Sequence, residues 1–247
     1  MNINKLPGQV RDDIEMQSLL ILKHIAEDIV VIGGWAVRAW VGEKHVRHTI
    51  DIDGYTEKDK LKYVKNKLKA AGIKNEESEW GIKFYTEYNA PYGLHKNPDD
   101  EVKDMIENLE LRIEISPPRI YESLTHHYFE FDVNDIVEKY VRAHGSNARF
   151  KIKVPPVEAL TANKLGLPGD YKNRFDAGVL LPLCDTDKLL EIIRRTDDWA
   201  DLIKRRTAKT IGRTKNKDDL ARHLLINAGI DIKGHIRHLI EINDKLL

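Results

Sequence analysis

The sequence predicts an α/β fold: a small mixed sheet with packed helices, followed by an all-helical C-terminal domain. Two observations carry this prediction. Segments in which apolar and polar residues alternate occur up to residue 154, whereas the chain after Pro155–Pro156 has helical periodicity. The 247 residues are enough for a sizeable core and one or two domains. We therefore expect a first domain at 1–153 and a second at 154–247.

The first 55 residues alternate between helix and strand. Residues 10–28 have apolar side chains at roughly helical spacing. "DIVVIGG" (28–34) predicts a buried strand that ends in a glycine turn, and residues 35–41 predict a helix stopped by Gly42. "HTIDIDGY" (48–55) alternates isoleucines with aspartates, which predicts a strand with both carboxylates on one face.

The rest of the chain follows the same rules. Thr56 is expected to cap a helix whose apolar residues recur at helical spacing. Strands are predicted at 80–88, 109–116 and 149–154, with a polar, turn-rich excursion at 89–108. The C-terminal helices are expected at 156–167, 173–183, 186–195, 197–208, 217–228 and 231–245.

Composition narrows the class of protein. Lys plus Arg and Asp plus Glu both number 40, so no global charge points to nucleic acid or membrane. The one cysteine, Cys184, excludes a disulfide framework and a cysteine-based zinc site. No apolar run reaches the roughly 18 residues of a membrane span, and the N-terminus lacks a signal-peptide core. We expect a cytoplasmic protein.

Asp51 and Asp53 are the first candidates for chemistry. Two residues apart on a strand, their side chains point the same way, roughly 7 Å apart. Two like charges held this close repel each other unless a cation sits between them, and carboxylate oxygens suit Mg²⁺. The alternative is that both carboxylates simply face water.

Two further features favour a chemical role for these aspartates, namely Gly33–Gly34 and a third carboxylate. Glycines between a strand and a helix let the backbone approach a phosphate, although they are also typical of an ordinary tight turn. In "LELRIEIS" the polar face carries Glu110, Arg112 and Glu114. If that strand neighbours the aspartate strand, Glu110 or Glu114 completes a three-carboxylate cluster of the kind that supports phosphoryl transfer.

These residues resemble the signature of the nucleotidyltransferase superfamily, which has the DNA polymerase beta-like fold. "GGWAVRAWVG…RHTIDID" matches its pattern at Gly33, Gly34, Ala36, Arg47, Thr49, Asp51 and Asp53. "RIEI" resembles its third-carboxylate strand and selects Glu114 over Glu110. The resemblance implies transfer of a nucleotide monophosphate from an NTP, with Mg²⁺ held by the three catalytic carboxylates. It implies nucleotide contacts from Gly33, Gly34, Arg47 and Thr49.

A second resemblance is to the AbiEii-like toxin branch of that superfamily. "PPVEALTANKLGLPGDYKNRFDAGVLL" is similar to its helical motif, with Lys164, Arg174 and Asp176 at matching positions. Asn173 departs from the usual Lys-Asp pair, which leaves the role of Asp176 open. Lys164 and Arg174 are expected to steady phosphate charge. Lys164 alternatively pairs with an acidic neighbour such as Asp51.

These features leave three hypotheses for the function of the protein. The main one is an AbiEii-like toxin that modifies tRNA or a protein and has an antitoxin partner. The alternative is an antibiotic nucleotidyltransferase of the aminoglycoside or lincosamide type, since those enzymes share the Gly-Gly-Trp-Ala sequence. The third is a catalytically silent nucleotide- or RNA-binding protein. The catalytic site is expected between the two predicted domains.

Four features allow two interpretations each. Trp35 either packs in the core or stacks on a base, and Arg47 either binds phosphate or braces the aspartate strand through a salt bridge. His48 is expected at the surface, with a role in the site as the alternative. The stretch 203–217 has seven Lys or Arg and no Asp or Glu, which is typical of a solvated face and compatible with RNA phosphates.

Overall fold

The computed structural model describes residues 6–78, 81–89, 100–122, 126–195 and 197–246. The chain forms two compact units, each built from separated segments. The sheet unit comprises Met1–Trp35, His48–Pro117 and Glu138–Val154, and the helical unit comprises Ala36–Arg47, Pro118–Val137 and Pro155–Leu247. The boundary near residue 153 that the sequence suggests stays a prediction.

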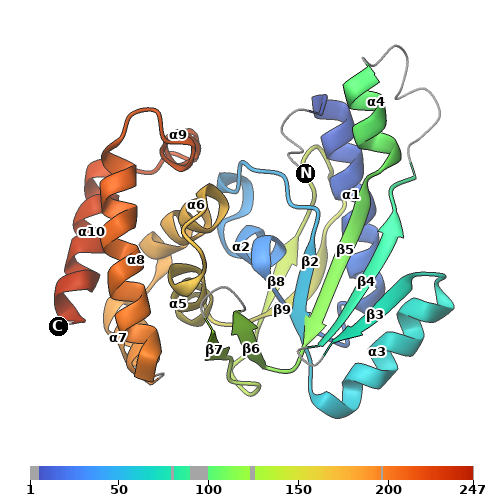
Figure 1. Ribbon diagram of the computed structural model, residues 1–247, viewed down its shortest axis with the longest axis horizontal. Coiled ribbons are helices and arrows are strands. Elements are labelled where there is room, and N and C mark those ends of the chain that lie inside the picture. The colour runs from blue at the N-terminus through green and yellow to red at the C-terminus, as the bar shows by residue number, and fades with distance from the viewer. Residues whose placement is uncertain (1–5, 79–80, 90–99, 123–125, 196, 247) are drawn as a thin grey trace. The chain divides into compact units, whose positions relative to one another are not determined.

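A seven-stranded mixed sheet forms the sheet unit (Figure 1), with strand order β3-β4-β5-β2-β1-β9-β8. β2 pairs in parallel with β5, and β1 with β9, while β1–β2, β3–β4 and β4–β5 are antiparallel. The strands are β1 (Val30–Ile32), β2 (Ile52–Tyr55), β3 (Lys74–Ser78), β4 (Gly81–Glu87), β5 (Glu110–Ser116), β8 (Val137–Val141) and β9 (Phe150–Val154). The α/β class with a mixed sheet and a helical C-terminal region is therefore confirmed.

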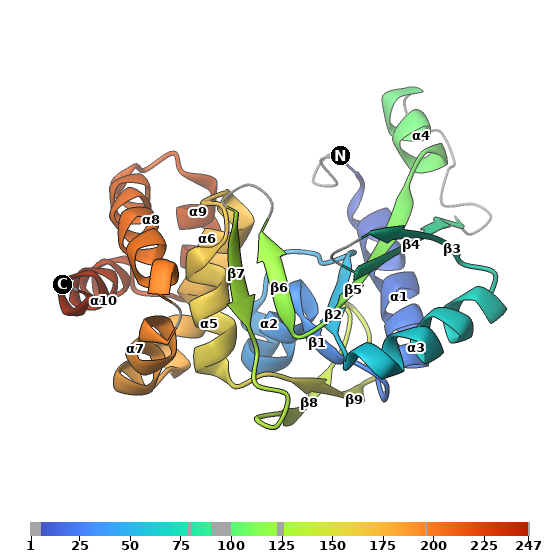
Figure 2. The same cartoon turned by 60° about the horizontal axis from the view of Figure 1, so that its bottom comes forward.

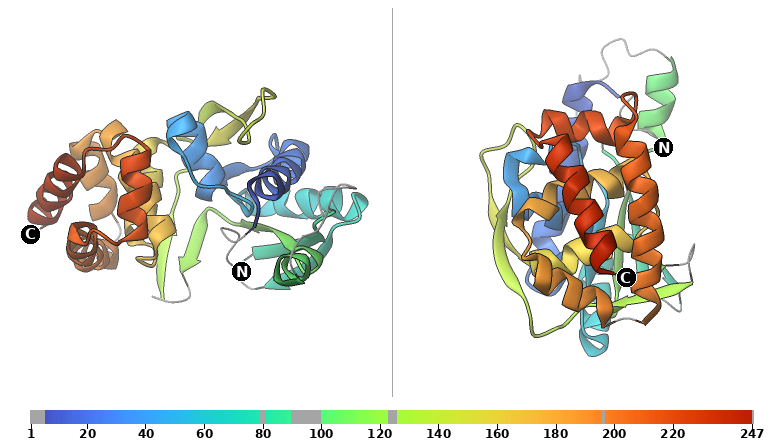
Figure 3. Two further views of the ribbon diagram at one scale, coloured as in Figure 1. Left: turned by 90° about the horizontal axis from the view of Figure 1, so that it is seen from above. Right: turned by 90° about the vertical axis from the view of Figure 1, so that its left-hand side faces the viewer.

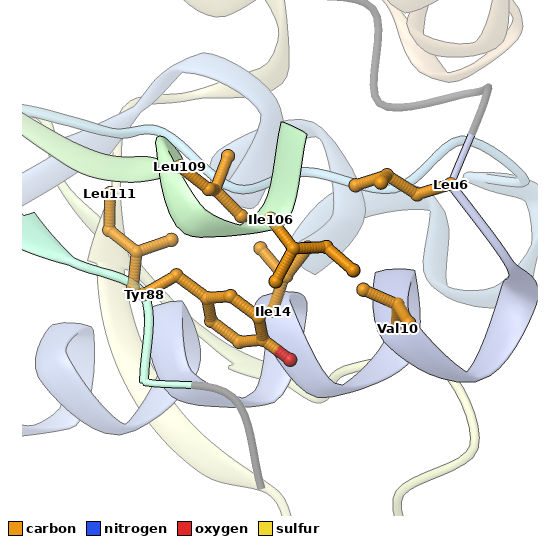
Figure 4. Close-up of a cluster of buried hydrophobic side chains, with 7 residues drawn as sticks. All are labelled: Leu6, Val10, Ile14, Tyr88, Ile106, Leu109 and Leu111. Carbon is orange, nitrogen blue, oxygen red and sulfur yellow. The ribbon is translucent and has the colours of Figure 1, made fainter. Parts of the chain in front are cut away.

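Helices α1 (Gly8–Ile25) and α3 (Lys58–Ala70) lie side by side against the sheet (Figure 3). At one end of α1, a cluster of buried apolar side chains joins α1 to β5 and to α4 (Asp100–Glu107), as Figure 4 shows. Its members are Leu6, Val10, Ile14, Tyr88, Ile106, Leu109 and Leu111. This packing aligns the start of β5.

The helical unit contains the C-terminal helices and a two-stranded hairpin. The hairpin is the antiparallel pair of β6 and β7 (Figure 2). Phe129 in β7 and the neighbouring Phe131 pack on each other, and Phe129 also packs on Trp199 of α8. α8 and α10 run side by side (Figure 3). The elements are α2 (Gly33–Val41, which begins in the sheet unit), η2 (Gly42–Lys44), β6 (Arg119–Glu122), β7 (His127–Glu130), α5 (Val157–Gly166), α6 (Tyr171–Leu180), η3 (Leu181–Leu183), α7 (Thr186–Arg194), α8 (Asp197–Lys215), α9 (Leu220–Asn227) and α10 (Ile232–Lys245).

Several local predictions need correction. Thr56 does not cap α3, because its hydroxyl donates to the carbonyl of Asp28 (2.9 Å) and Glu57 stands at the N-cap without a side-chain bond. The predicted polar excursion contains α4, since Val102, Met105 and Ile106 give residues 100–107 an apolar face. Residues 90–99 of that excursion, and Trp80 of the strand predicted at 80–88, lie outside the described residues.

Other predictions differ from the structure in the number or the length of the elements. β3, β6, β7 and β8 were not predicted, because their short segments lack a clean alternation of apolar and polar residues. α8 continues to Lys215, beyond the predicted end at 208, and buries Thr207 and Thr214 on the way. Within the part of the chain that the structure describes, no helix combines the length and apolarity of a membrane span.

Candidate active site

Gly33 and Asp53 are in close contact at the junction between β1 and α2. Gly33 has a φ of +65°, a conformation that favours glycine, and it is the first residue of α2. A Cβ at Gly33 would lie 2.1 Å from Oδ2 of Asp53. The space that a side chain would fill is therefore occupied by the carboxylate of Asp53, which β1–β2 pairing holds opposite Ile32.

Glu114 is the register partner of Asp53. The parallel pairing of β2 with β5 sets Asp53 opposite Glu114, so both side chains project from the same face of the sheet. On β4, Lys83 is opposite Glu114 and its Nζ lies 3.2 Å from a carboxylate oxygen of Glu114. Glu110 lies four residues earlier on β5, ahead of the segment paired with β2, and is opposite Glu87 instead. The carboxylate that joins Asp53 is thus Glu114.

Asp51 lies just before β2 and not within it, so the predicted strand at 48–55 begins at Ile52. The segment that leads to Asp51 is fixed by α1. The amide of Thr49 donates to Oε1 of the buried Glu15 (2.7 Å), and the hydroxyl of Ser18 donates to the carbonyl of Ile50 (2.8 Å). This anchoring positions Asp51 at the start of the strand that carries Asp53.

The donor set suits a hard cation. Asp53 and Glu114 are register partners on adjacent strands, and Asp51 lies two residues before Asp53. Mg²⁺ prefers oxygen ligands, usually one or two carboxylates together with waters and substrate phosphates. The cation that the structure places beside the partly exposed Glu114 is the ammonium group of Lys83.

A second group of charged residues lies inside the helical unit around Asp176, which is fully buried. Arg47 donates to both carboxylate oxygens, Nε to Oδ1 at 2.8 Å and Nη2 to Oδ2 at 2.6 Å. Nζ of Lys164 lies 3.0 Å from Oδ2, and Nε2 of His45 lies 3.3 Å from Oδ1. The acidic partner that Lys164 needs is therefore Asp176.

The electrostatics of this group follow from burial and pairing. Burial alone would raise the pKa of Asp176, but the charges of Arg47 and Lys164 hold it well below its usual value. Burial lowers the pKa of His45 to about 3, against the hydrogen bond to Asp176, so the imidazole is neutral at pH 7. Asp176 thus carries the negative charge that compensates two cations.

Arg174 and Asn173 are tied to the turn before α6. Nη1 of Arg174 lies 2.8 Å from Oδ1 of Asp219, and its Nε donates to the carbonyls of Gly169 and Asp170. The amide of Asn173 donates to the N-capping Asp170, and its side chain donates to the carbonyl of Pro168. The predicted phosphate contacts of Arg47, Lys164 and Arg174, like those of Gly34 and Thr49, remain predictions.

The open interpretations can now be narrowed. Trp35 is fully buried and donates to the hydroxyl of Ser18 (3.2 Å), so it packs in the core. His48 is not at the surface as expected: 13% of its side chain is exposed and its Nε2 lies 2.7 Å from Asp12. Within 203–217, Arg206 and Arg213 contact the carbonyls of Gly166 and Gly169, while the other cations of the run are exposed or half-buried.

Sequence reasoning missed Lys83, Glu15 and His144. Lys83 alternates with Ile82 and Phe84, so the strand pattern puts it on the polar face, but only the register sets it opposite Glu114. Glu15 falls within a helix that the sequence predicts, where no local signal marks a buried carboxylate. His144 comes from a distant turn, and its meeting with Glu15 depends on the tertiary structure alone.

Known proteins provide an independent comparison. The family model of the aminoglycoside-2''-adenylyltransferases matches residues 16–96, the segment that carries Gly33, Asp51 and Asp53. No curated protein matches the chain.

Two solved structures are similar in fold. The solution structure of the antibiotic-resistance factor ANT(2'')-Ia is 13% identical with a TM-score of 0.47, over 85% of this chain and 100% of that chain. A crystal structure of a candidate nucleotidyltransferase from H. pylori is 16% identical with a TM-score of 0.46, over 98% of this chain and 97% of that chain. At these values neither likeness extends an activity to this chain.

The family match over residues 16–96, together with the carboxylates paired on the mixed sheet, points to the class of the nucleotidyltransferases. Within that class, residues 16–96 relate the chain to the aminoglycoside-2''-adenylyltransferases. This match favours the antibiotic-type alternative over the AbiEii-like toxin, and it does not support the toxin–antitoxin interpretation.

Proposed function

We propose that this protein transfers a nucleotide monophosphate, most simply AMP from ATP, to a hydroxyl group of an aminoglycoside-type acceptor. The observation that carries the proposal is the pairing of Asp53 with Glu114 beside the side-chain-free Gly33. The choice of acceptor and of ATP is supported by the family match over residues 16–96. A cytoplasmic location fits this function, because the donor NTP is found there.

Each residue of the site has a role in the proposal. Gly33 and Gly34 present backbone amides to the β- and γ-phosphates, a task suited to a helix N-terminus. Asp51, Asp53 and Glu114 would hold Mg²⁺, which would supply charge neutralisation at the phosphates and the departing pyrophosphate. Glu114 also orients the acceptor hydroxyl and takes its proton as the oxygen attacks the α-phosphorus and the bond to pyrophosphate breaks.

The proposal is tested by incubating the protein with each α-labelled NTP and Mg²⁺. Separate reactions contain a panel of aminoglycosides, a lincosamide, total tRNA and total protein. We expect label on an aminoglycoside, with ATP preferred, and an equal amount of released pyrophosphate. Label on tRNA or protein alone would contradict the acceptor. No label on any acceptor, together with no binding of Mg²⁺–NTP, would contradict the activity.

One observation favours a second acceptor. Helix α8 carries three exposed or half-buried cations, Lys204, Arg205 and Lys209. The stretch 203–217 around them has no Asp or Glu, and such cations attract nucleic-acid phosphates. A tRNA acceptor, as in the AbiEii-like interpretation, therefore remains the second candidate. The same labelling panel separates the two acceptors.

A further inference from the structure

Three side chains of metal-ligand type meet in the sheet unit, apart from the carboxylates of the candidate active site. Glu15 comes from α1, His48 from the segment before β2, and His144 from the turn between β8 and β9. Each of them offers one ligand atom, and these atoms all lie within 4.8 Å of one another. Residues far apart in sequence are thus brought to one point.

Glu15 is held in a fixed orientation. Its carboxylate is fully buried and accepts the amides of Thr49 and His144, each at 2.7 Å. Nδ1 of His144 lies 2.8 Å from the same oxygen that accepts its own amide. A carboxylate fixed by two backbone amides loses little conformational entropy on binding a cation, so this ligand is preorganised.

His48 completes the set. Its Nε2 lies 2.7 Å from Oδ1 of Asp12, and its ring centroid lies 4.6 Å from that of His144. A carboxylate paired with a histidine is the usual second shell of a metal-binding imidazole.

We propose that Glu15, His48 and His144 bind one divalent cation of the zinc class. Two imidazoles and one carboxylate are a typical zinc donor set, with bonds of about 2.0–2.2 Å, whereas Mg²⁺ takes oxygen ligands. Tetrahedral bonds of that length separate ligand atoms by roughly 3.4 Å, which the observed span of 4.8 Å allows after a small adjustment. The fourth position is left to a water molecule.

Such a cation would connect α1 to the segment that leads to Asp51. Glu15 already holds the amide of Thr49, two residues before Asp51. The turn of His144 is held by Glu15 as well, and the cation would add His48 to this anchor. We expect it to stabilise the sheet unit and not to take part in nucleotide transfer, so the proposal stands whether or not the proposed function is correct.

The test uses the untagged full chain, stripped of metal by a chelator and titrated with Co²⁺ and Zn²⁺. We expect one Co²⁺ per chain with a four-coordinate absorption spectrum, displaced by Zn²⁺ and not by excess Mg²⁺. His48→Gln and His144→Gln should each weaken binding by about a hundredfold or more, since even second-shell losses cost 10- to 100-fold. The thermal midpoint of the wild type should rise with Zn²⁺, and that of the variants should not.

Two controls separate this site from others. His24→Gln changes an exposed histidine on the same helix as Glu15 and should leave Co²⁺ binding unchanged. Asp53→Asn removes an active-site carboxylate and should also leave it unchanged. The proposal is overturned if the wild type binds no Co²⁺ below millimolar concentrations. It is equally overturned if both histidine variants, folded by circular dichroism, bind as the wild type does, or if Asp53→Asn alone abolishes binding.

Discussion

Asp53 on β2 and Glu114 on β5 are register partners across a parallel strand pair. They come from segments 61 positions apart, yet their carboxylates project from the same face of one sheet. Gly33 lies against Asp53, because a Cβ there would be 2.1 Å from its carboxylate. The first two predictions follow from these contacts.

Asp53→Asn and Glu114→Gln should each lower nucleotide transfer by at least about a hundredfold, because metal charge stabilisation contributes several kcal/mol. For Asp53→Asn the free energy of unfolding should hold or rise slightly, since one of two like charges is removed. For Glu114→Gln it should change by less than about 1 kcal/mol, because the exposed pair with Lys83 is also lost. Steady-state kinetics and urea unfolding measure the two effects. Glu110→Gln is the matched control on the same strand, and its kcat should be unchanged. If Glu110→Gln inactivates the protein and Glu114→Gln does not, the assignment of the third carboxylate is wrong.

Gly33→Ala should destabilise the protein more than Gly42→Ala. Both glycines have positive φ, +65° and +60°, so each substitution costs about 1–2 kcal/mol in backbone strain. Only at Gly33 does the new methyl group collide with Asp53, because nothing lies within 4 Å of a Cβ at Gly42. Chemical unfolding and NTP binding should both report a larger loss for Gly33→Ala. Equal losses would mean that the contact with Asp53 has no energetic role.

Asp176→Asn should cost about 3–5 kcal/mol of stability, because it leaves Arg47 and Lys164 buried without their counter-charge. The matched control is Glu191→Gln, which breaks an exposed helical pair with Arg195 and should cost less than about 0.5 kcal/mol. Denaturant midpoints at pH 7.5 measure both. If Asp176→Asn lowers the free energy of unfolding no more than Glu191→Gln does, the negative charge of Asp176 does not stabilise the buried group with Arg47 and Lys164.

Stability should fall as the pH drops from 6.5 towards 4, in part because of His235. Burial, and to a lesser extent His238, lowers the pKa of His235 to about 4. Between these pH values the unfolded chain binds one more proton than the folded chain, so each pH unit removes about 1.4 kcal/mol. His45, with its pKa lowered to about 3, adds a second proton over a wider range.

His235→Leu should make the free energy of unfolding depend less steeply on pH, because the variant no longer binds this proton on unfolding. Among the described residues, neither ring nitrogen of the buried His235 has a hydrogen-bond partner. The variant should therefore be as stable as the wild type at pH 8, or more stable by about 1 kcal/mol. His223→Gln, at an exposed position of α9, should keep the full slope. Unfolding free energies measured from pH 4.5 to 8 decide between these outcomes, and an unchanged slope in His235→Leu would refute the assignment.

Replacing Lys204, Arg205 and Lys209 by alanine tests the RNA acceptor. If α8 contacts RNA through phosphates, the slope of log affinity against log salt should flatten by roughly 0.7–0.9 per lost contact. Arg206 is retained, because it also contacts the carbonyl of Gly166. Lys58, Lys62 and Lys69 on α3 form an exposed control set. Equal slopes for the wild type and both triple variants would identify 203–217 as a solvated face.

The local features of this protein could be read from its sequence. Alternation of apolar and polar residues identified β5, because half-buried strands bury every second side chain. The glycines after an apolar strand marked the start of α2, and two aspartates two residues apart marked the candidate metal site. Each of these signals depends only on neighbours within a few residues, so it does not depend on how the rest of the chain packs.

Only the tertiary structure determined which side chains contact each other. Glu110 and Glu114 share a strand face, and only the pairing of β5 with β2 selects Glu114. The buried cations Arg47 and Lys164 require an acidic partner, and the packing of the helical unit places Asp176 beside both. The meeting of Glu15 with His144 crosses 129 positions of chain. Burial makes such contacts strong, but no local pattern encodes them, because they depend on where distant elements pack.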